Sequence, residues 1–425
     1  MMTSYFTRTG VRLITLLLLL AVAAGGRAQI LQLPGSELGK LVGQQTAIYS
    51  FFAFRDGRFD PVPHQWLEYS KEGFPYFETD STTTRAGDKN LIDGSDILLL
   101  RKQDGGERLS QQPVEQVVGE LSITMPDGER YFYVVRNAYR QATQRYVKFD
   151  AQKMVIKSTD YALYLDDNNM LIWNDFFYRG YKGSAGQRET ILDTLKIRLS
   201  AGVFRENSRI TLTNDNLEPK IEEIIEGPLA WQIHATTTLS VAKIPVMKIR
   251  NYFLLMPQQN DIHARFTLPL IAKTVLQDPH ISISLDGNQL YDGKLVTSWT
   301  GSNVAITDGK MSDSEKEMVG HPMSGKNWIW FSTGRGFDIL AQLDFREGFQ
   351  APARLLYEDD ATLENLPERF PGQLPNVGFT IEQIPIGKDF NFLTRLFFSD
   401  NSDGLPPGKY ADTTLAEPQI TYRAL

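Results

Sequence analysis

The chain of 425 residues contains no cysteine. This absence excludes disulfides and thiol chemistry, and it excludes a lipoprotein, because lipid attachment at a cleavage site requires a cysteine. Small secreted domains commonly need disulfides, but a chain of this length can bury enough apolar surface to do without them. We therefore expect stability to come from hydrophobic burial.

Long hydrophobic runs are also absent, apart from one at the N-terminus. Leu13–Ala24 is shorter than the roughly 20 apolar residues of a membrane-spanning helix. Arg8 and Arg12 precede it, and Gly26-Arg27-Ala28 supplies small residues for cleavage. We predict a Sec-type signal peptide over residues 1–28, a mature chain that begins at Gln29, and a location in the periplasm, or outside the cell, of a Gram-negative bacterium. No membrane span is expected after cleavage.

Acidic residues outnumber basic ones, by 51 to 44. The formal net charge is −7, and loss of the three arginines of the signal peptide takes it to −10. Such a chain is a poor match for nucleic acid unless a local basic patch exists. We expect no nucleic-acid partner.

Catalytic and metal-binding motifs are missing as well. The histidines, at positions 64, 234, 263, 280 and 321, form no His-Glu-x-x-His pattern. Asp400–Gly404 lacks the spacing of a calcium loop and is typical of a turn. No Gly-x-Ser-x-Gly elbow is present. We expect no metal and no cofactor, and the sequence leaves open whether the protein is an enzyme.

The mature chain is rich in short runs of Val, Ile, Thr, Tyr and Phe, separated by Gly, Pro, Asp and Asn clusters. This pattern predicts an all-β fold, with one short helix at Ser312–Val319. Small residues cluster in Tyr181–Gln187. We therefore predict an N-terminal β-rich domain over residues 29–185 and a large antiparallel β-sandwich over residues 186–425.

Three long strands are expected in succession at Pro228–Val241, Val246–Met256 and Asp261–Pro269. The first and third alternate between apolar and polar residues, so one face packs on the core and the other faces water or a groove. Short links join the three strands. The pattern predicts an antiparallel meander.

The strand order here resembles the central sheet of galactose-mutarotase-like sandwiches. Lys220–Pro228, Arg250–Met256 and Asp261–Phe266 carry the likeness, which covers roughly residues 190–345. It implies a mutarotase-like supersandwich fold, which aldose epimerases, polysaccharide lyases and hydrolases share. Upstream, Pro61–Gln65 and Asp93–Leu100, with Tyr146–Asp150, are similar to a pattern in uncharacterised exported proteobacterial proteins. That similarity implies a compartment and no chemistry.

The polar face of the meander carries candidate catalytic residues. Arg265 would neutralise a uronate carboxylate, His234 or His263 would accept a proton, and Tyr252 would protonate the leaving oxygen. In the alternative interpretation, these are ordinary solvated residues. An epimerase would instead oppose a histidine acid to a glutamate base, a role that the sequence cannot assign among Glu222, Glu223 and Glu226.

Aromatic residues gather beside the glycine-rich segment near residue 185. Sugar rings stack on aromatic side chains, so this cluster predicts a glycan platform, although core packing is the alternative. The candidate ligand-binding residues are Trp173, Phe177, Tyr178 and Tyr181, together with Gln232 on the polar face.

We therefore expect a periplasmic β-sandwich protein that binds or processes a polysaccharide or envelope glycan. The alternative is a non-catalytic component of a cell-envelope assembly or export system, with an envelope protein partner, that handles a glycan or lipid. A polysaccharide lyase is the second alternative. A deep groove at His234, His263 and Arg265 would favour an enzyme, and a flat or covered face would favour the assembly component.

Overall fold

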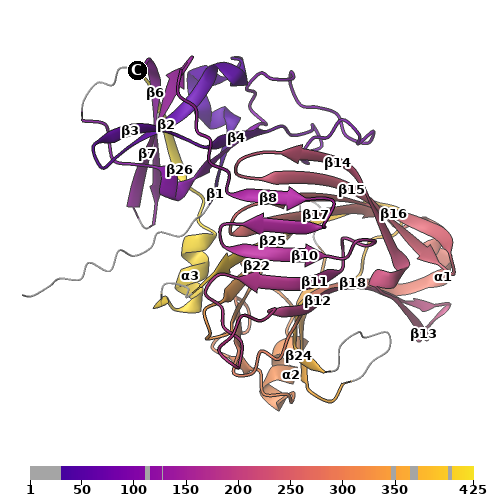
Figure 1. The fold of residues 1–425 in the computed structure, drawn as a ribbon. Coiled ribbons are helices and arrows are strands. Elements are labelled where there is room, and N and C mark those ends of the chain that lie inside the picture. Colours follow the sequence, from indigo (N-terminus) through magenta and orange to yellow (C-terminus); the bar gives the residue numbers. More distant parts are fainter. Residues whose placement is uncertain (1–29, 111–114, 127, 346–350, 364–371, 401–403) are drawn as a thin grey trace, which may run out of the picture.

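The computed structural model describes residues 30–110, 115–126, 128–345, 351–363, 372–400 and 404–425. The expected signal peptide and its cleavage site at Gln29 lie outside these ranges, as does most of the Asp400–Gly404 turn. Within the described ranges the fold is all-β, as predicted, and its sheets are antiparallel (Figure 1).

Two sheets form an N-terminal unit around Leu33, Phe51, Leu98 and Phe132. The first has the order β1-β5-β4 and the second β26-β6-β7-β2-β3. Strand β26 comes from the C-terminal part of the chain and pairs with β6, so it belongs to the N-terminal unit. The strands are β1 (Ile30–Pro34), β4 (His64–Leu67), β5 (Ile97–Arg101), β2 (Tyr49–Arg55), β3 (Arg58–Val62), β6 (Val117–Met125), β7 (Gly128–Arg136) and β26 (Gln419–Ala424).

The large sandwich consists of a five-stranded and a nine-stranded sheet. Their orders are β13-β12-β18-β24-β23 and β14-β15-β16-β17-β25-β22-β21-β19-β20. The first contains β12 (Leu192–Val203), β13 (Arg205–Leu212), β18 (Leu276–Gly287), β23 (Ala353–Asp360) and β24 (Gln373–Ile381). The second contains β14 (Leu217–Glu226), β15 (Trp231–Val241), β16 (Ile244–Leu255), β17 (Gln259–Thr267), β19 (Lys294–Thr297), β20 (Ala305–Ile306), β21 (Trp328–Ser332), β22 (Asp338–Phe345) and β25 (Asp389–Ser399).

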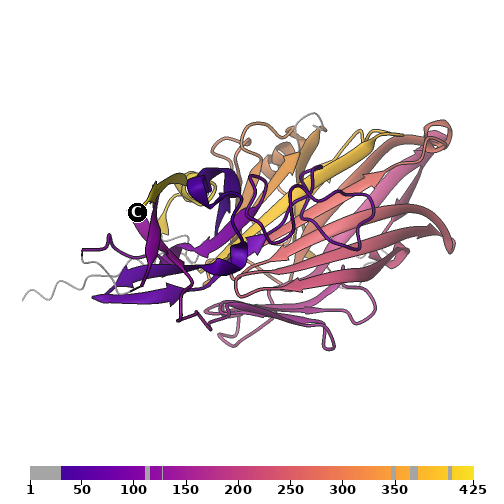
Figure 2. The same cartoon turned by 90° about the horizontal axis from the view of Figure 1, so that it is seen from above.

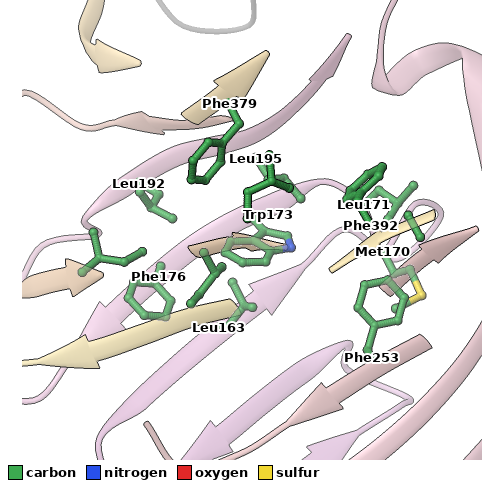
Figure 3. Close-up of a cluster of buried hydrophobic side chains, with 14 of the residues drawn as sticks. Leu163, Met170, Leu171, Trp173, Phe176, Leu192, Leu195, Phe253, Phe379 and Phe392 are labelled. Atoms are coloured by element: carbon green, nitrogen blue, oxygen red, sulfur yellow. The ribbon is translucent and has the colours of Figure 1, made fainter. Parts of the chain in front are cut away.

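A four-stranded sheet, β11-β10-β9-β8, packs against the hydrophobic core of the sandwich. It contains β8 (Val147–Asp150), β9 (Val155–Ser158), β10 (Tyr161–Leu165) and β11 (Trp173–Tyr178). Leu163, Trp173 and Phe176 of this sheet lie with Leu195 and Phe379 of the sandwich (Figure 3). The largest core thus draws side chains from both sides of residue 185. The domain division at that residue stays a prediction.

The three expected long strands are β15, β16 and β17, and they form the predicted meander. Trp231, Ile233 and Ala235 of β15 face the core, as alternation indicated, and Gln232 and His234 occupy the other face. The hairpin between β15 and β16 turns at Ala242-Lys243, both with positive φ, which fits the right-handed twist of paired strands.

Helices are short. The expected helix is α2 (Asp313–Gly320), and it begins with a capping box in which Ser312 and Glu315 bond each other's backbone N–H. The others are α1 (Ala272–Val275), α3 (Pro407–Thr414) and the 3-10 turns η1 (Gly35–Leu41), η2 (Thr46–Ile48), η3 (Lys102–Asp104) and η4 (Asn214–Asn216). None of the helices in the described ranges is long and apolar enough to cross a membrane.

Candidate functional site: a covered polar face and an open groove

The nine-stranded sheet brings the four predicted catalytic residues together on one face. His234 of β15 pairs with Tyr252 of β16, which pairs with His263 of β17. Neighbouring strands lie about 4.8 Å apart, so this register corresponds to a separation of roughly 10 Å between the two histidine positions. Arg265 is two residues from His263 and shares its face.

This face is covered by residues 70–80 of the N-terminal unit, which we call the strap. The Phe74 ring stacks on Tyr252 at 5.4 Å and meets His263 edge-on at 6.2 Å. Phe77 lies 5.5 Å from His234. Figure 2 shows the N-terminal part of the chain passing over the strands of this sheet. Tyr252 is 0% and His234 2% exposed, so neither is open to solvent.

Asp80 at the end of the strap is the electrostatic centre of the covered face. The Tyr252 hydroxyl donates to Asp80 Oδ2 at 2.5 Å, and Arg250 Nε lies 3.6 Å from Oδ1. Burial raises the pKa of Asp80, but hydrogen bonds from Thr82 and Tyr252 outweigh it, and the pKa lies below its usual value. Burial and the hydrogen bond to Asp80 raise the pKa of Tyr252. Asp80 is therefore ionised and Tyr252 protonated at neutral pH.

His234 is held in one tautomer by a relay of hydrogen bonds. Thr79 donates its N–H and its hydroxyl to Glu223 Oε2, at 2.9 and 3.0 Å. The hydroxyl oxygen is then an acceptor for His234 Nδ1, 3.1 Å away. Nε2 is buried and finds no hydrogen-bond partner among the described residues. Because burial lowers the pKa of His234, the ring is neutral at pH 7 and Nε2 carries a lone pair.

Arg265 already has a counter-ion. Its Nε donates to Asp389 Oδ2 at 2.7 Å, and its guanidinium lies 5.1 Å from the Phe74 ring centre. For Arg265 to neutralise a substrate carboxylate, as predicted, that carboxylate would have to displace Asp389. Gln232, also on this face, is buried. The cluster holds an ionised acid, a neutral base and a protonated phenol, but the strap separates them from solvent.

An open groove lies elsewhere, on the four-stranded sheet and the loop that follows it. It has a volume of about 680 Å³. Three of the predicted ligand-binding residues line it, namely Phe177, Tyr178 and Tyr181, but Tyr178 and Tyr181 are only 6% and 4% exposed and also belong to the hydrophobic core. Tyr164 adds a ring that meets Phe177 edge-on at 5.9 Å. Trp173 does not line the groove, because its side chain points into the core (Figure 3).

Four basic side chains also line this groove, and sequence reasoning missed them. They are Lys157, Arg179, Lys182 and Arg188, and the single carboxylate among the described lining residues is Asp160. Asp160 is buried and pairs with Arg179 at 3.1 Å, while the Arg188 guanidinium stacks 4.4 Å above the Phe177 ring. The net charge of the whole chain hid this local patch. The available signal was the closeness of Arg179, Lys182 and Arg188 in the sequence, with no acidic residue between Arg179 and Arg188.

No metal centre is evident in the ranges that the structure covers, where no three His, Asp or Glu side chains gather in a way that could hold an ion.

The sheets define an all-β protein in which a large antiparallel β-sandwich carries an N-terminal β unit. No protein-family model matches the chain, and neither does any curated protein sequence.

Solved structures with a similar course of the chain include an α-mannosidase from Enterococcus faecalis, with 10% identity and a TM-score of 0.46 over 94% of this chain and 44% of that one. A heparan sulfate lyase from Pedobacter heparinus matches 62% of this chain and 38% of its own, with 10% identity and a TM-score of 0.33. A GalM/aldose epimerase homologue from C. elegans matches 59% and 98%, with 6% identity and a TM-score of 0.33. The chain spans less than half the length of the mannosidase.

Proposed function

We propose that this protein binds an acidic polysaccharide in the groove over β9–β11, as a non-catalytic component of the bacterial cell envelope. One observation carries the proposal: a groove of about 680 Å³ combines aromatic rings with four basic side chains and a single, already paired carboxylate. Aromatic faces stack on the apolar C–H faces of sugar rings, and the cations supply charge-assisted hydrogen bonds to uronate, sulfate or phosphate groups.

The covered polar face supports a binding role over a catalytic one. Tyr252 and His234 lie under the strap, and Arg265 is paired with Asp389. A general acid or base must come within hydrogen-bond reach of the proton that it transfers. With the strap in place, no substrate reaches the Tyr252 hydroxyl or His234 Nε2.

Export is the second part of this proposal. The charged start, the short apolar run and the small residues before Gln29 support a cleaved signal peptide and a periplasmic location. Mass spectrometry of the protein from a periplasmic extract is expected to find Gln29 at the N-terminus. An intact Met1 in the membrane fraction would contradict export in soluble form. A protein partner in the envelope stays a proposal.

Binding is tested by calorimetric titration with polygalacturonate, with neutral dextran as the comparison. We expect binding to polygalacturonate that weakens with salt, and little or none to dextran. Lys182→Gln with Arg188→Gln is expected to weaken binding by at least tenfold, because each charged hydrogen bond contributes about 1.5–3 kcal/mol. Phe177→Ala is expected to weaken binding without changing its salt dependence.

The matched control is Lys294→Gln with Lys310→Gln, two exposed lysines outside the groove. This pair removes the same formal charge and is expected to leave binding unchanged. Equal losses in both double variants would mean that only overall charge matters. If the protein bound neither polygalacturonate nor a sulfated or phosphorylated glycan, the proposed function would be wrong.

A polysaccharide lyase is a second candidate, favoured by the neutral His234 and the protonated Tyr252 beside ionised Asp80. It requires the strap to move. Phe74→Ala with Phe77→Ala would loosen the strap, and elimination would appear as ultraviolet absorbance of an unsaturated uronate. If wild type and the folded variant both lack this product on acidic polysaccharides, this candidate is wrong.

A further inference from the structure

A second, chemically different cavity opens at the end of the sandwich that lies far from the N-terminal unit, where β13, α1 and the tip of β16 meet (Figure 1). Its volume is about 470 Å³. Leu199 and Leu212 line it from the five-stranded sheet, and Leu239, Met247 and Phe266 line it from the nine-stranded sheet. The cavity therefore runs between the two sheets.

Large apolar side chains surround the mouth of this cavity. Ile210, Val246 and Ile271 line it and are also 41–71% exposed. Three more residues are 65–71% exposed close to this lining. Leu270 directly precedes Ile271, Ile244 lies two residues before Val246, and the Phe204 backbone N–H donates to the carbonyl of the lining residue Val275. These six make up half of the exposed large hydrophobic side chains of the described chain. Such a gathering is unusual for a protein surface and marks a binding site.

Cations stand beside this apolar mouth. Lys243 occupies the hairpin turn next to Ile244, and Lys273 lies two residues beyond Ile271. Both lysines are exposed. Arg209 lies at the same end and is held by Asp278 and His280. The site thus pairs an apolar interior with a positively charged rim.

We infer that this cavity binds the acyl chain of a single anionic amphiphile, with its charged headgroup held outside by Lys243 and Lys273. Packed sheets lie about 10 Å apart and an α-helix with its side chains is 10–12 Å wide, so a helical peptide does not fit between them. A linear hydrocarbon chain does. The cavity volume lies in the range of small-molecule sites, which are mostly apolar with a few placed polar groups.

This inference does not depend on the proposed function, since the cavity and the groove share no lining residue. The ligand source to which we commit is a monomeric long-chain carboxylate or similar amphiphile, taken up one chain at a time. A lipid bilayer surface would contact only the exposed mouth and leave the space between the sheets unfilled.

The experiment is a fluorescence titration of the full protein with cis-parinaric acid, followed by displacement with palmitate. We expect saturable binding of about one equivalent and full displacement by palmitate. Shorter fatty acids should bind more weakly, by roughly fourfold for each methylene removed, as expected for burial of the chain. Hexadecanol should displace the probe less well than palmitate, because it lacks the charge.

Variants test whether binding depends on the mouth of this cavity or on exposed hydrophobic surface in general. Ile271→Glu and Val246→Glu place a carboxylate at the mouth and are expected to weaken palmitate binding at least tenfold. Val304→Glu is the matched control, an exposed apolar residue outside the cavity lining, and it should bind as wild type does. Lys243→Gln with Lys273→Gln should weaken palmitate binding but not hexadecanol binding.

Three outcomes would overturn the inference. The first is no saturable binding of parinaric acid, and the second is equal weakening by Val304→Glu. The third is binding to anionic phosphatidylglycerol vesicles without displacement of the probe by palmitate, which would make the mouth a membrane-contact surface. Circular dichroism of each variant confirms that it is folded before any loss is interpreted.

Discussion

Asp80 is the residue on which the covered face depends. It is buried and accepts hydrogen bonds from Tyr252, from the Thr82 backbone and from the Thr82 hydroxyl. An asparagine keeps the shape but turns an amide N–H₂ toward donors. We expect Asp80→Asn to lower the free energy of unfolding by about 1–3 kcal/mol, measured by urea denaturation at pH 7.

The same measurement has a pH signature. The pKa of Asp80 is lowered in the folded state, so its contribution is present above the unfolded pKa and is lost as pH falls through the folded pKa. Wild type and Asp80→Asn should therefore converge in stability at acid pH. Asp88→Asn, at an exposed position of the same unit, should change stability by less than about 0.5 kcal/mol. A gap that stays constant down to acid pH would contradict this account.

His64 gives a second prediction about pH, in which burial, and not hydrogen bonding, lowers the pKa of the folded state. Burial lowers its pKa to about 4, so the folded ring is neutral where the unfolded ring, near 6.5, is already protonated. Between those values the unfolded state binds more protons, and stability falls as pH falls. His64→Phe keeps a ring beside Phe51, whose centroid lies 4.9 Å from that of His64, but it cannot titrate. We expect wild type to lose stability relative to this variant between pH 7 and pH 5 in urea denaturation.

The sequence predicted on which face of a strand a side chain lies, but not which distant part of the chain covers that face. Alternation along β15 and β17 placed His234, His263 and Arg265 on one face, because side-chain direction in a strand is a local property. Alternation could not reveal the strap, because the contacts of Phe74 and Phe77 with β15–β17 span more than 150 positions in the chain. Nor did aromatic content distinguish Trp173 in the core from Phe177 in the groove.

At the scale of elements, one glutamine clamps the N-terminal unit to the sandwich. Gln65 of β4 donates to the Ala230 carbonyl at 3.1 Å and accepts from the Leu229 and Ala230 N–H groups at 3.2 and 2.9 Å. Gly227 lies against it, and a Cβ at that position would come within 1.9 Å of Gln65 Oε1. The Gln65 side chain therefore supplies the residues directly before β15 with the hydrogen bonds that a neighbouring strand would otherwise give them.

We expect Gln65→Leu to lower the free energy of unfolding by about 3 kcal/mol or more, measured by thermal or urea denaturation. The reason is that it leaves three buried backbone groups without partners. Gly227→Ala should destabilise as well, since the added methyl group displaces the glutamine. Gln44→Leu, at an exposed position of the same unit, is the control and should be close to neutral. A near-neutral Gln65→Leu would show that the clamp contributes little.

Element pairing was predictable only where it is local. The β15–β16–β17 meander follows from three alternating runs with short links. The pairing of β17 with β25, and of β6 with β26, joins strands that are more than a hundred residues apart. Register between distant strands depends on packing and not on neighbouring residues, so the sequence predicted the strands but not the order of the sheets.

For the whole molecule, the arrangement of the cores makes a prediction about cooperativity. Ile30, Leu67 and Leu99 of the N-terminal unit lie in one buried cluster with two residues of the sandwich. These are Leu254 of β16 and Met256, which directly follows that strand. The strap adds Phe74 and Phe77 against Tyr252. Separating the two units would expose these side chains, each of which stabilises by roughly 1.5–3 kcal/mol when fully buried.

We therefore expect the N-terminal unit and the sandwich to unfold together, in one transition. Differential scanning calorimetry should give a calorimetric enthalpy close to the van't Hoff enthalpy, and urea curves from tryptophan fluorescence and far-ultraviolet circular dichroism should coincide. Trp66 reports on the N-terminal unit, and Trp231 and Trp328 report on the sandwich. Independent domains divided at residue 185 would instead unfold in two steps. A Trp66→Phe, Trp173→Phe variant, which lacks both tryptophans before that residue, would then lose the fluorescence change of one step only. Because the C-terminal strand β26 pairs with β6, truncation before residue 418 should weaken the N-terminal unit although the deleted residues lie at the far end of the chain.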